Sequence, residues 1–198
     1  MLDIGCGSAL YKKILQEDIS YVGLELDTNR NPDVVGNALE LPFESACFDN
    51  LICLEVLEHL PEPEKALKEM VRVAKPGARL LLSTPMSWYL HYEPLDFYRF
   101  TKYGLKYLFE KVGFQIIYIE PTGGFWTIVI SRALETIFHL FYKFTLPIKW
   151  VTGKNKGRWR LAIMLLLPAT LLGMLMRKVM DTSGSIFIQG WVILAEKV

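Results

Sequence analysis

The chain has 198 residues, of which 52% are hydrophobic and 22% charged, with a formal net charge of +1 at pH 7. This length suits one domain with room for a large insertion. The charge balance excludes a disordered polar tail and a uniformly basic nucleic-acid-binding protein. The cysteines Cys6, Cys47 and Cys53 form neither a disulfide framework nor a paired Cys-x-x-Cys site, so we expect a reducing, cytoplasmic environment and no metal centre.

Residues 1–121 alternate short apolar runs with stretches of helical pattern. The runs of strand length, several of them rich in β-branched or aromatic residues, are Leu2–Ile4, Tyr21–Glu25, Val34–Gly36, Phe48–Leu54 and Ala78–Ser83. Helices are predicted over Ser8–Gln16, Pro63–Ala74 and Thr101–Val112, and two late strands over Phe114–Glu120 and Ser185–Lys197. This alternation predicts an α/β fold with a parallel sheet.

Local signals bound the second and third predicted helices. Pro63 suits a first helical turn, where its missing N–H removes no hydrogen bond, and Pro76-Gly77 is expected to stop the helix. Thr101 can cap the third helix at its amino end, and Gly113 follows its last turn.

The first predicted strand runs into a glycine turn, Gly5-Cys6-Gly7, that leads to the first predicted helix. Glycines there let the backbone turn tightly and approach a ligand, and the helix start behind them offers unpaired N–H groups to an anion. A dinucleotide fingerprint needs a third glycine at position 10, where the chain has Leu10. Asp3, ahead of the glycines, better suits a ligand with an ammonium group. A tight turn that binds nothing is the structural alternative.

Glu25 ends the second predicted strand, 18 residues after Gly7. A carboxylate about 20 residues beyond the glycines is placed to accept hydrogen bonds from both hydroxyls of a ribose. The alternative is an exposed acid at a strand end, with no ligand.

Further motifs follow these two in order. They are Gly36-Asn37-Ala38, Leu41-Pro42-Phe43, Phe48-Asp49, Leu57-Glu58-His59 and Ala74-Lys75-Pro76-Gly77. Together with Asp3-x-Gly5-x-Gly7 and Glu25, the series resembles the class I S-adenosylmethionine-dependent methyltransferases, in particular the small-molecule group that includes quinone-biosynthesis enzymes. The resemblance covers roughly residues 1–121 and the last strand. It implies a Rossmann-like, mostly parallel seven-stranded sheet with an antiparallel last strand, and S-adenosylmethionine lying across the carboxyl ends of the strands.

By position, the resemblance assigns a set of residues to S-adenosylmethionine. It places Asp3, Gly5 and Gly7 at the methionine half of the cofactor, Glu25 at the ribose hydroxyls, Leu26, Asn37 and Ala38 around the adenine, and Leu54 and Glu55 at the wall of the pocket.

The chain departs from the family pattern in three ways. Ala9 stands where a glycine is usual, and Asn37 where an Asp is usual, although an amide oxygen can still accept from the adenine amino group. The chain also begins one residue before the first motif, whereas the family has helices ahead of it that cover the cofactor. We therefore expect either a longer natural chain or a site without that lid.

Methyl transfer needs a nucleophile aligned with the methyl group and shielded from water, and a base only where a hydroxyl must lose a proton. The candidate catalytic residues are His59, after the fourth predicted strand, and His91 and Tyr98, in the loop after the fifth. Loops at such strand ends often carry substrate residues. Each histidine could instead serve as a structural hydrogen-bond partner of the backbone. Arg99 is expected to pair with a neighbouring acid such as Asp96.

Residues 123–183 form a hydrophobic, basic insertion between the last two predicted strands. They hold nine Lys and Arg residues against Glu135 and Asp181, a net charge of +7, which leaves −6 for the rest of the chain. Within the insertion, residues 125–144 have the pattern of an amphipathic helix with a wide apolar face.

The segment Leu161–Met176 has sixteen residues without a charge and contains Pro168 and Gly173. A bilayer span wants roughly 20 apolar residues, so we expect peripheral contact with the inner face of a membrane, helped by the tryptophans and basic residues of the insertion. The alternatives are a soluble cap over the substrate pocket and a dimer interface.

The sequence therefore predicts one methyltransferase domain over residues 1–198 that uses S-adenosylmethionine. We expect a small, apolar or lipid-like acceptor at or near a membrane, and no nucleic acid. Two other functions stay open at this point. One is a non-catalytic membrane adaptor that keeps a relic cofactor fold, and the other is an NAD-dependent oxidoreductase, against which Leu10 argues.

Overall fold

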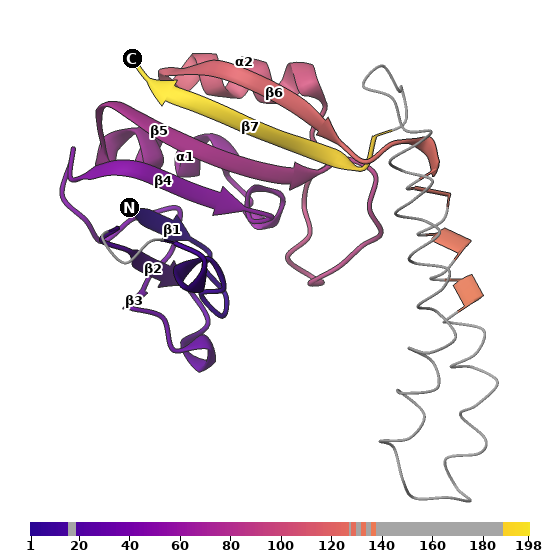
Figure 1. Cartoon of the computed structure of the whole chain (residues 1–198), viewed down its shortest axis with the longest axis horizontal. Helices are drawn as coiled ribbons and strands as arrows, with labels where there is room; N and C mark the ends of the chain where they lie inside the picture. Colours follow the sequence, from indigo (N-terminus) through magenta and orange to yellow (C-terminus); the bar gives the residue numbers. More distant parts are fainter. Residues whose placement is uncertain (16–18, 127, 130–131, 134–135, 138–187) are drawn as a thin grey trace, which may run out of the picture. The chain divides into compact units, whose positions relative to one another are not determined.

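The structure of the protein, a computed structural model, describes residues 1–15, 19–126, 128–129, 132–133, 136–137 and 188–198 (Figure 1). The chain divides into two compact units, which are Met1–Glu120 with Gly190–Val198, and Pro121–Gln189. The first unit contains the sheet described below.

The sheet has seven strands in the order β3-β2-β1-β4-β5-β7-β6. Their bounds are β1 Leu2–Ile4, β2 Val22–Glu25, β3 Val34–Val35, β4 Phe48–Leu54, β5 Ala74–Pro85, β6 Phe114–Thr122 and β7 Gly190–Lys197. The pairs β1/β2, β2/β3, β1/β4 and β4/β5 are parallel, whereas β7 runs antiparallel to β5. The predicted fold class is therefore confirmed. The strand order reverses between β1 and β4, and open α/β sheets bind ligands beside such a reversal.

In the described part of the chain, the α-helices α1 and α2 accompany the sheet, and their ends follow the sequence signals closely. Helix α1 spans Pro63–Val73 with Pro63 in its first turn, and α2 spans Lys102–Val112. The Thr101 hydroxyl accepts from the Gly104 backbone N–H at 3.1 Å, which confirms the predicted cap. Gly113 ends α2 with a φ of 101°, in the left-handed region that glycine enters without a steric penalty.

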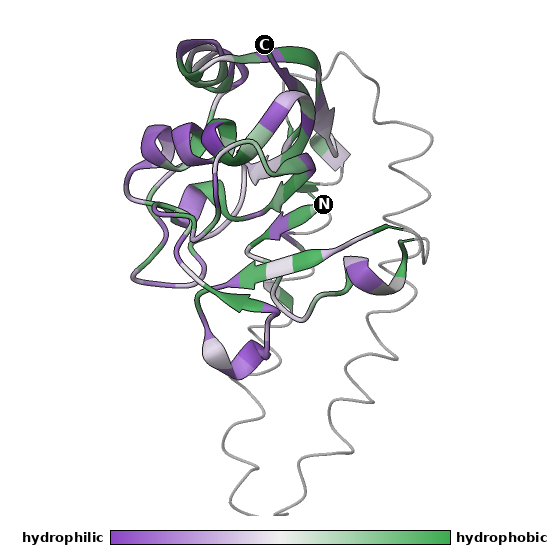
Figure 2. Cartoon of the chain, turned by 90° about the vertical axis from the view of Figure 1, so that its left-hand side faces the viewer, coloured by the Kyte–Doolittle hydropathy of each residue, from purple (hydrophilic) through white to green (hydrophobic). Residues whose placement is uncertain are grey.

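The core lies between the sheet and these helices. The apolar residues of α1 and α2 that are fully buried are Ala66, Leu67, Met70, Val73, Leu105 and Phe109. The Phe109 ring packs against Phe114 at the start of β6, with ring centroids 5.8 Å apart. Figure 2 shows hydrophobic residues concentrated in the strands, while the helices carry both hydrophobic and hydrophilic residues. This is the pattern of amphipathic helices packed on a sheet.

A set of partly buried hydrogen bonds fixes the segment that follows β3. The Arg72 guanidinium of α1 donates to the carbonyls of Phe43 at 2.7 Å and Leu41 at 2.9 Å. Glu69, which pairs with Arg72, accepts from the Leu41 N–H at 2.8 Å. These three hydrogen bonds to α1 hold the backbone at Leu41 and Phe43 in one position.

The first predicted helix, Ser8–Gln16, is wrong over its described residues. They form turns and one short 3-10 helix, Tyr11–Lys13, and Ala9 has a φ of 51°. Leu10 and Ile14, which would supply the apolar stripe, are 62% and 77% exposed. Helices of this length depend on packing of an apolar face, and these side chains have none to pack against in the described structure.

Two other boundaries differ from the sequence expectation. Strand β5 begins at Ala74 and not at Ala78, because Ala74 pairs with Phe48 before a shift of register carries Arg79 opposite Asn50. Strand β7 begins at Gly190, and residues 185–187 of the predicted strand lie outside the described residues.

The second unit is described only in part. Its described residues between 125 and 137 are helical, in agreement with the start of the predicted amphipathic helix. The Ile128 N–H donates to the Gly124 carbonyl at 3.0 Å. The rest of that helix and the run Leu161–Met176 lie outside the described residues. Among the residues that are described, no helix has the length and apolar character needed to span a membrane.

The buried ring of Phe109 provides a test of this packing. Phe109→Ala is expected to lower the free energy of unfolding by about 3–5 kcal/mol, because it leaves a cavity between α2 and the sheet. Tyr103, on the same helix and 81% exposed, is the matched control, and Tyr103→Ala should change stability by less than about 0.5 kcal/mol. Urea unfolding of the two variants measures both values, and equal losses would contradict this arrangement of α2.

Candidate functional site

The predicted cofactor residues meet at the carboxyl edge of the parallel strands. In the register of the sheet, Ile4 of β1 stands between Leu24 of β2 and Cys53 of β4. Glu25 and Leu54 are therefore the next residues of their strands, level with Gly5 at the turn after β1. The parallel pairing thus brings three distant segments of sequence together, as the sequence predicts.

The turn after β1 needs its glycines for two different reasons. Gly5 has a φ of 73°, and a Cβ built on it would lie 2.4 Å from Cγ2 of Val56, so no side chain fits. Gly7 has a φ of 53° and open space where its Cβ would be. The backbone at Gly7 is therefore accessible to a ligand, whereas Gly5 allows the close approach of two loops.

Glu25 is held by backbone N–H groups from two loops. One carboxylate oxygen accepts from the Gly7 N–H at 3.0 Å, and the other from the Leu26 N–H at 2.8 Å and the Asp27 N–H at 3.3 Å. Two carboxylate oxygens offer about four acceptor sites, so this carboxylate can still accept a further hydrogen bond. The geometry orients an acidic acceptor toward the open space at Gly7.

Asp3 is a buried acid beneath this turn. Asp3 is 2% exposed, and its carboxylate accepts a hydrogen bond from the Tyr21 hydroxyl at 2.6 Å. Burial raises the pKa of the Asp3 carboxyl, the Tyr21 hydrogen bond opposes this, and the nearby Glu25 carboxylate adds to it. A cationic ligand group would compensate a carboxylate in this position.

The residues expected around an adenine lie after β2 and β3. Leu26 is 61% exposed directly after Glu25, and Ala38 is 7% exposed. The Asn37 side-chain oxygen already accepts from the Leu39 N–H at 2.9 Å, which leaves its second lone pair and its amide N–H groups for a ligand. Glu55, after β4, has a φ of 55° and accepts from the Ser83 hydroxyl at 2.7 Å.

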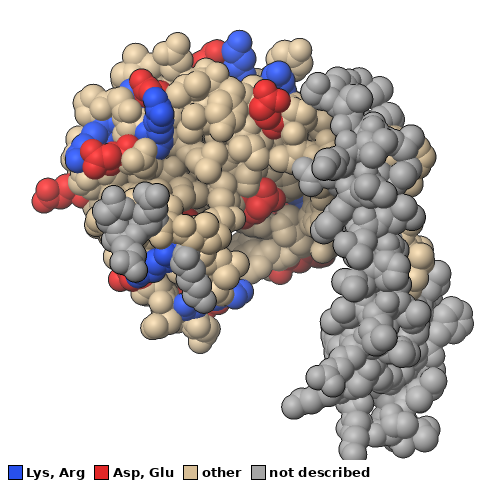
Figure 3. All heavy atoms as spheres, viewed as in Figure 1, with Lys and Arg blue, Asp and Glu red and all other residues tan. Residues whose placement is uncertain are grey.

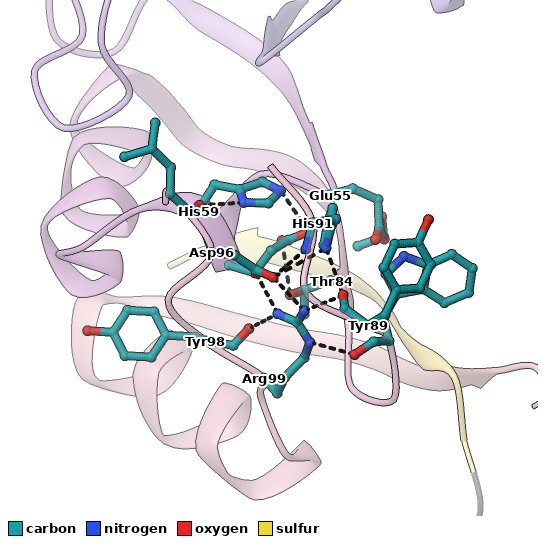
Figure 4. A network of polar contacts seen from close by, with 12 residues as sticks. Glu55, His59, Thr84, Tyr89, His91, Asp96, Tyr98 and Arg99 are labelled. Atoms are coloured by element: carbon teal, nitrogen blue, oxygen red, sulfur yellow. Dashed lines mark hydrogen bonds and ion pairs between the residues drawn. The ribbon is translucent and has the colours of Figure 1, made fainter. Parts of the chain in front are cut away.

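A second polar cluster lies beside this edge, after β4 and β5 (Figure 4). His59 ends a 3-10 helix, Leu57–His59, and its Nδ1 lies 2.6 Å from the Leu95 carbonyl. The Nδ1 of His91 lies 3.2 Å from the Tyr89 carbonyl and 3.4 Å from a carboxylate oxygen of Asp96. The two rings meet edge to face with centroids 4.7 Å apart. The structure therefore brings the two predicted histidines together.

The loop that carries His91 is braced by a partly buried ion pair. Arg99 makes a bidentate contact to Asp96 with distances of 2.7 and 2.8 Å, as expected from the sequence. The guanidinium holds the pKa of the Asp96 carboxyl well below its usual range. Arg99 also donates to the Tyr89 carbonyl, and Asp96 accepts from the His91 backbone N–H. This network fixes the loop on both sides of His91.

Glu58 lies at the centre of the second cluster and is fully buried. One of its oxygens accepts from the Thr84 hydroxyl at 3.2 Å, and the other, Oε1, has no hydrogen-bond partner. Burial raises the pKa of the Glu58 carboxyl to about 7. The backbone carbonyl of Glu58 accepts from the N–H groups of Phe97 and Tyr98, so the same residue also ties down the loop after β5.

Tyr98 stands apart from the other two catalytic candidates. Its hydroxyl donates to the Pro61 carbonyl at 3.0 Å, and Figure 4 shows its ring directed away from His59 and His91. Its catalytic role stays a prediction, whereas its contact with Pro61 positions the loop.

Glu58 and Thr84 are site residues that the sequence does not predict. The signal for Glu58 was its place next to His59 directly after β4. No sequence signal shows that the Glu58 side chain turns into the core while His59 stays partly accessible.

On the face drawn in Figure 3, acidic and basic side chains lie next to one another over the described residues, so that face presents no field of one sign.

Comparisons with known proteins identify the segment that builds this edge. A methyltransferase domain family matches residues 2–82. The ubiquinone biosynthesis O-methyltransferase of Idiomarina loihiensis is 31% identical over 100 residues, covering 42% of this chain and 41% of that protein. The ajmaline N-methyltransferase of Rauvolfia serpentina is 32% identical over 103 residues, covering 41% of this chain and 34% of that protein. The matches thus span less than half the length of these curated relatives.

Solved structures share the fold at low sequence identity. The cyclase SpnF superposes with a TM-score of 0.63 at 18% identity, covering 99% of this chain and 74% of that chain. A methyltransferase dependent on S-adenosylmethionine from Archaeoglobus fulgidus gives a TM-score of 0.59 at 18% identity, covering 99% of this chain and 85% of that chain. At this identity the likeness concerns the fold alone.

The buried charge of Asp3 predicts a pH-dependent stability difference. Because its pKa is raised in the folded state, ionised Asp3 is less favourable there than in the unfolded chain. Asp3→Asn removes that charge and keeps an oxygen for Tyr21, so the variant should gain stability relative to the natural protein as pH rises above the ordinary pKa of 3.8. Urea unfolding from about pH 3 to pH 7 measures the gap. A difference in the free energy of unfolding that is constant over this pH range would contradict a raised pKa of Asp3.

Proposed function

Because a methyltransferase domain family matches residues 2–82, we propose that this protein is a class I S-adenosylmethionine-dependent methyltransferase, which transfers the methyl group of that cofactor to a small acceptor molecule. The observation that supports the proposal is the arrangement of three residues at the carboxyl edge of the strands. The backbone turn is open at Gly7, the Glu25 carboxylate is held by the Gly7 N–H, and Asp3 is a buried acid. The cluster of His59 and His91 beside it supplies groups that can meet an acceptor.

The residues at the edge fit S-adenosylmethionine. A Cβ on Gly7 would meet nothing within 4 Å, so a ligand can approach the backbone there. Glu25 keeps acceptor capacity for a ribose hydroxyl, and Asp3 offers negative charge toward the ammonium end of the cofactor. Leu26, 61% exposed, can cover an apolar ring face. We assign Gly5, Asn37, Ala38, Leu54 and Glu55 to the same pocket by their positions after the strands.

The bound cofactor supplies a methyl group attached to a positively charged sulfur. That sulfur is a good leaving group, because it keeps the electron pair of the carbon–sulfur bond when the methyl group is transferred. The protein then has to align the acceptor, exclude water and remove a proton if the acceptor is a hydroxyl. In His59 and His91, a carbonyl or carboxylate faces Nδ1, so Nδ1 carries the proton and Nε2 keeps its lone pair in the neutral ring. Each Nε2 lone pair could therefore accept a hydrogen bond or a proton from a hydroxyl of the methyl acceptor.

The loop that carries His91 supports an apolar acceptor. It exposes large apolar side chains, with Leu90 66%, Tyr92 61%, Leu95 41% and Phe97 45% exposed. Exposed apolar groups gathered on one loop are typical of a surface that binds an apolar molecule. Relatives of this chain include a demethylmenaquinone methyltransferase of Paenarthrobacter aurescens, 41% identical over 69 residues, covering 33% of this chain and 27% of that protein. We propose an acceptor of comparable apolar character.

Cofactor binding tests the proposal directly. Gly7→Arg should reduce the affinity for S-adenosylmethionine at least 100-fold, because the added side chain enters the space that the cofactor needs. Gly77 is a matched control, since it also has a positive φ and has nothing within 4 Å of a built Cβ. It lies near the amino end of β5, away from the carboxyl edge where the cofactor residues lie. Gly77→Arg should therefore bind as the natural protein does, measured by isothermal titration calorimetry.

Two outcomes would contradict this function. Absence of cofactor binding to the natural protein, with Gly7→Arg indistinguishable from it, would favour an adaptor that keeps only the fold. A thermal shift with NAD⁺ and none with S-adenosylmethionine would favour an oxidoreductase.

We further propose that the insertion, residues 123–183, brings the enzyme to a membrane surface. Its sequence supports this with a net charge of +7 and long apolar runs. The protein should float with vesicles that contain anionic lipid and should be released by high salt. Combined substitution of Lys154, Lys156 and Arg158 by Ala should weaken flotation, because each basic residue near the surface contributes about 1 kcal/mol. Equal flotation with neutral vesicles would overturn the electrostatic part.

A further inference from the structure

Glu58 has an unpaired carboxylate oxygen in the protein interior. Glu58 is fully buried, and its Oε1 has no hydrogen-bond partner while its other oxygen accepts from Thr84. A buried polar atom left unpaired costs about 1–3 kcal/mol, and most buried polar atoms in folded proteins have a partner. The position of Oε1 is therefore explained most simply by a ligand that pairs with it.

Two imidazole nitrogens face this oxygen. His59 Nε2 lies 3.7 Å and His91 Nε2 3.9 Å from Glu58 Oε1. These three atoms all lie within 4.8 Å of one another. The separations are too long for direct hydrogen bonds. They leave room for a small ion between the three atoms.

The outer nitrogens of both rings are held in the manner of metal ligands. His59 Nδ1 lies 2.6 Å from the Leu95 carbonyl. His91 Nδ1 lies 3.2 Å from the Tyr89 carbonyl and 3.4 Å from Asp96, which Arg99 fixes in turn. Histidines that bind metals donate their second N–H to a carbonyl or carboxylate in this way, and the contact directs the Nε2 lone pair toward the ion.

We propose that Glu58, His59 and His91 form a binding site for a divalent transition-metal ion, with Zn²⁺ as the best match. Two imidazole nitrogens and one carboxylate oxygen are a known ligand set for catalytic zinc and for related first-row metals. Mg²⁺ and Ca²⁺ prefer ligands that are all oxygen. The expectation of no metal centre rests on sequence spacing, and spacing does not reveal ligands that come from two separate loops.

The distances are compatible with metal binding after a small contraction. Tetrahedral zinc with bonds of about 2.1 Å places its ligand atoms roughly 3.4 Å apart. The two separations from Glu58 Oε1, 3.7 and 3.9 Å, need to shorten by a few tenths of an ångström. The separation of the two imidazole nitrogens is at most 4.8 Å and shortens by up to about 1.4 Å. The side chains of His59 and His91 are 16% and 26% exposed, so the rings can adjust, and the fourth coordination position opens on their accessible side.

This site deepens the proposed methyl transfer, on which the role of the fourth position rests. An acceptor bearing an oxygen atom can occupy that position, and coordination lowers the pKa of a bound hydroxyl. In that case the Nε2 lone pairs coordinate the ion and do not accept the proton directly. The ion, held by the two histidines, then promotes loss of the proton from the acceptor's hydroxyl. The inference that the ion binds does not itself depend on methyl transfer.

Titration of the chelator-treated full chain with Zn²⁺ tests the site. Calorimetry should show one high-affinity ion per chain, without S-adenosylmethionine present. Glu58→Gln and His91→Ala should each reduce the affinity at least 100-fold, since each removes one of three ligands. Cys47, an exposed thiol elsewhere, is the control, and Cys47→Ser should bind Zn²⁺ as the natural protein does.

A measurement on the natural protein alone makes the test independent of how the variants fold. In nitrogen-15 NMR spectra, Zn²⁺ should shift the Nε2 resonances of two histidines and leave their Nδ1 atoms protonated. Absence of a one-to-one site, Nδ1 ligation, or unchanged affinity in folded Glu58→Gln and His91→Ala would each overturn the proposal. So would binding of Mg²⁺ in preference to Zn²⁺. Failure of methyl transfer would be seen separately, as loss of S-adenosylmethionine binding with Zn²⁺ binding intact.

Discussion

The functional edge depends on the parallel register of β1, β2, β4 and β5. Parallel strands end at the same side of a sheet, and the register sets Ile4, Leu24 and Cys53 side by side. Every predicted site residue after these strands inherits its place from that alignment. The backbone N–H groups of Gly5 and Cys6 donate to the Leu24 carbonyl, so the turn after β1 continues the contact with β2 beyond the strand itself.

A second constraint places the loop after β5 over the loop after β4. The Glu58 carbonyl accepts from the N–H groups of Phe97 and Tyr98, and the ion pair of Asp96 and Arg99 closes the loop around His91. At its far end, the Trp191 indole of β7 donates to the Phe100 carbonyl at 3.1 Å in a buried contact. The loop is therefore held at three points, which preorganises the histidines before any ligand binds.

The sequence predicts the sheet well and the polar cluster only in part. Strand Phe48–Leu54 and the helix starting at Pro63 follow from local patterns, and both match the structure. The helix over Ser8–Gln16 fails because helical periodicity does not say whether Leu10 and Ile14 find a surface to pack on.

The meeting of His59 with His91 is a different kind of problem for sequence reasoning. The resemblance to a family places both residues at the same edge, since β4 and β5 are neighbours. It does not give their separation, because that depends on hydrogen bonds to the Leu95 and Tyr89 carbonyls within an irregular loop. Nor does any local pattern reveal that Glu58 is buried while His59, its neighbour in the same 3-10 helix, remains accessible.

The fold alone does not determine which reaction takes place at this edge. Among the solved structures that share the fold, one is a cyclase and another depends on S-adenosylmethionine for methyl transfer. In this chain, the buried Glu58 has an unpaired oxygen that faces two oriented imidazoles. Such a group lowers the stability of the protein unless a ligand pairs with it, and local rules of folding are broken most often at functional sites. The chemistry of this protein is therefore to be sought where β4 and β5 end, beside the edge that carries Gly7 and Glu25.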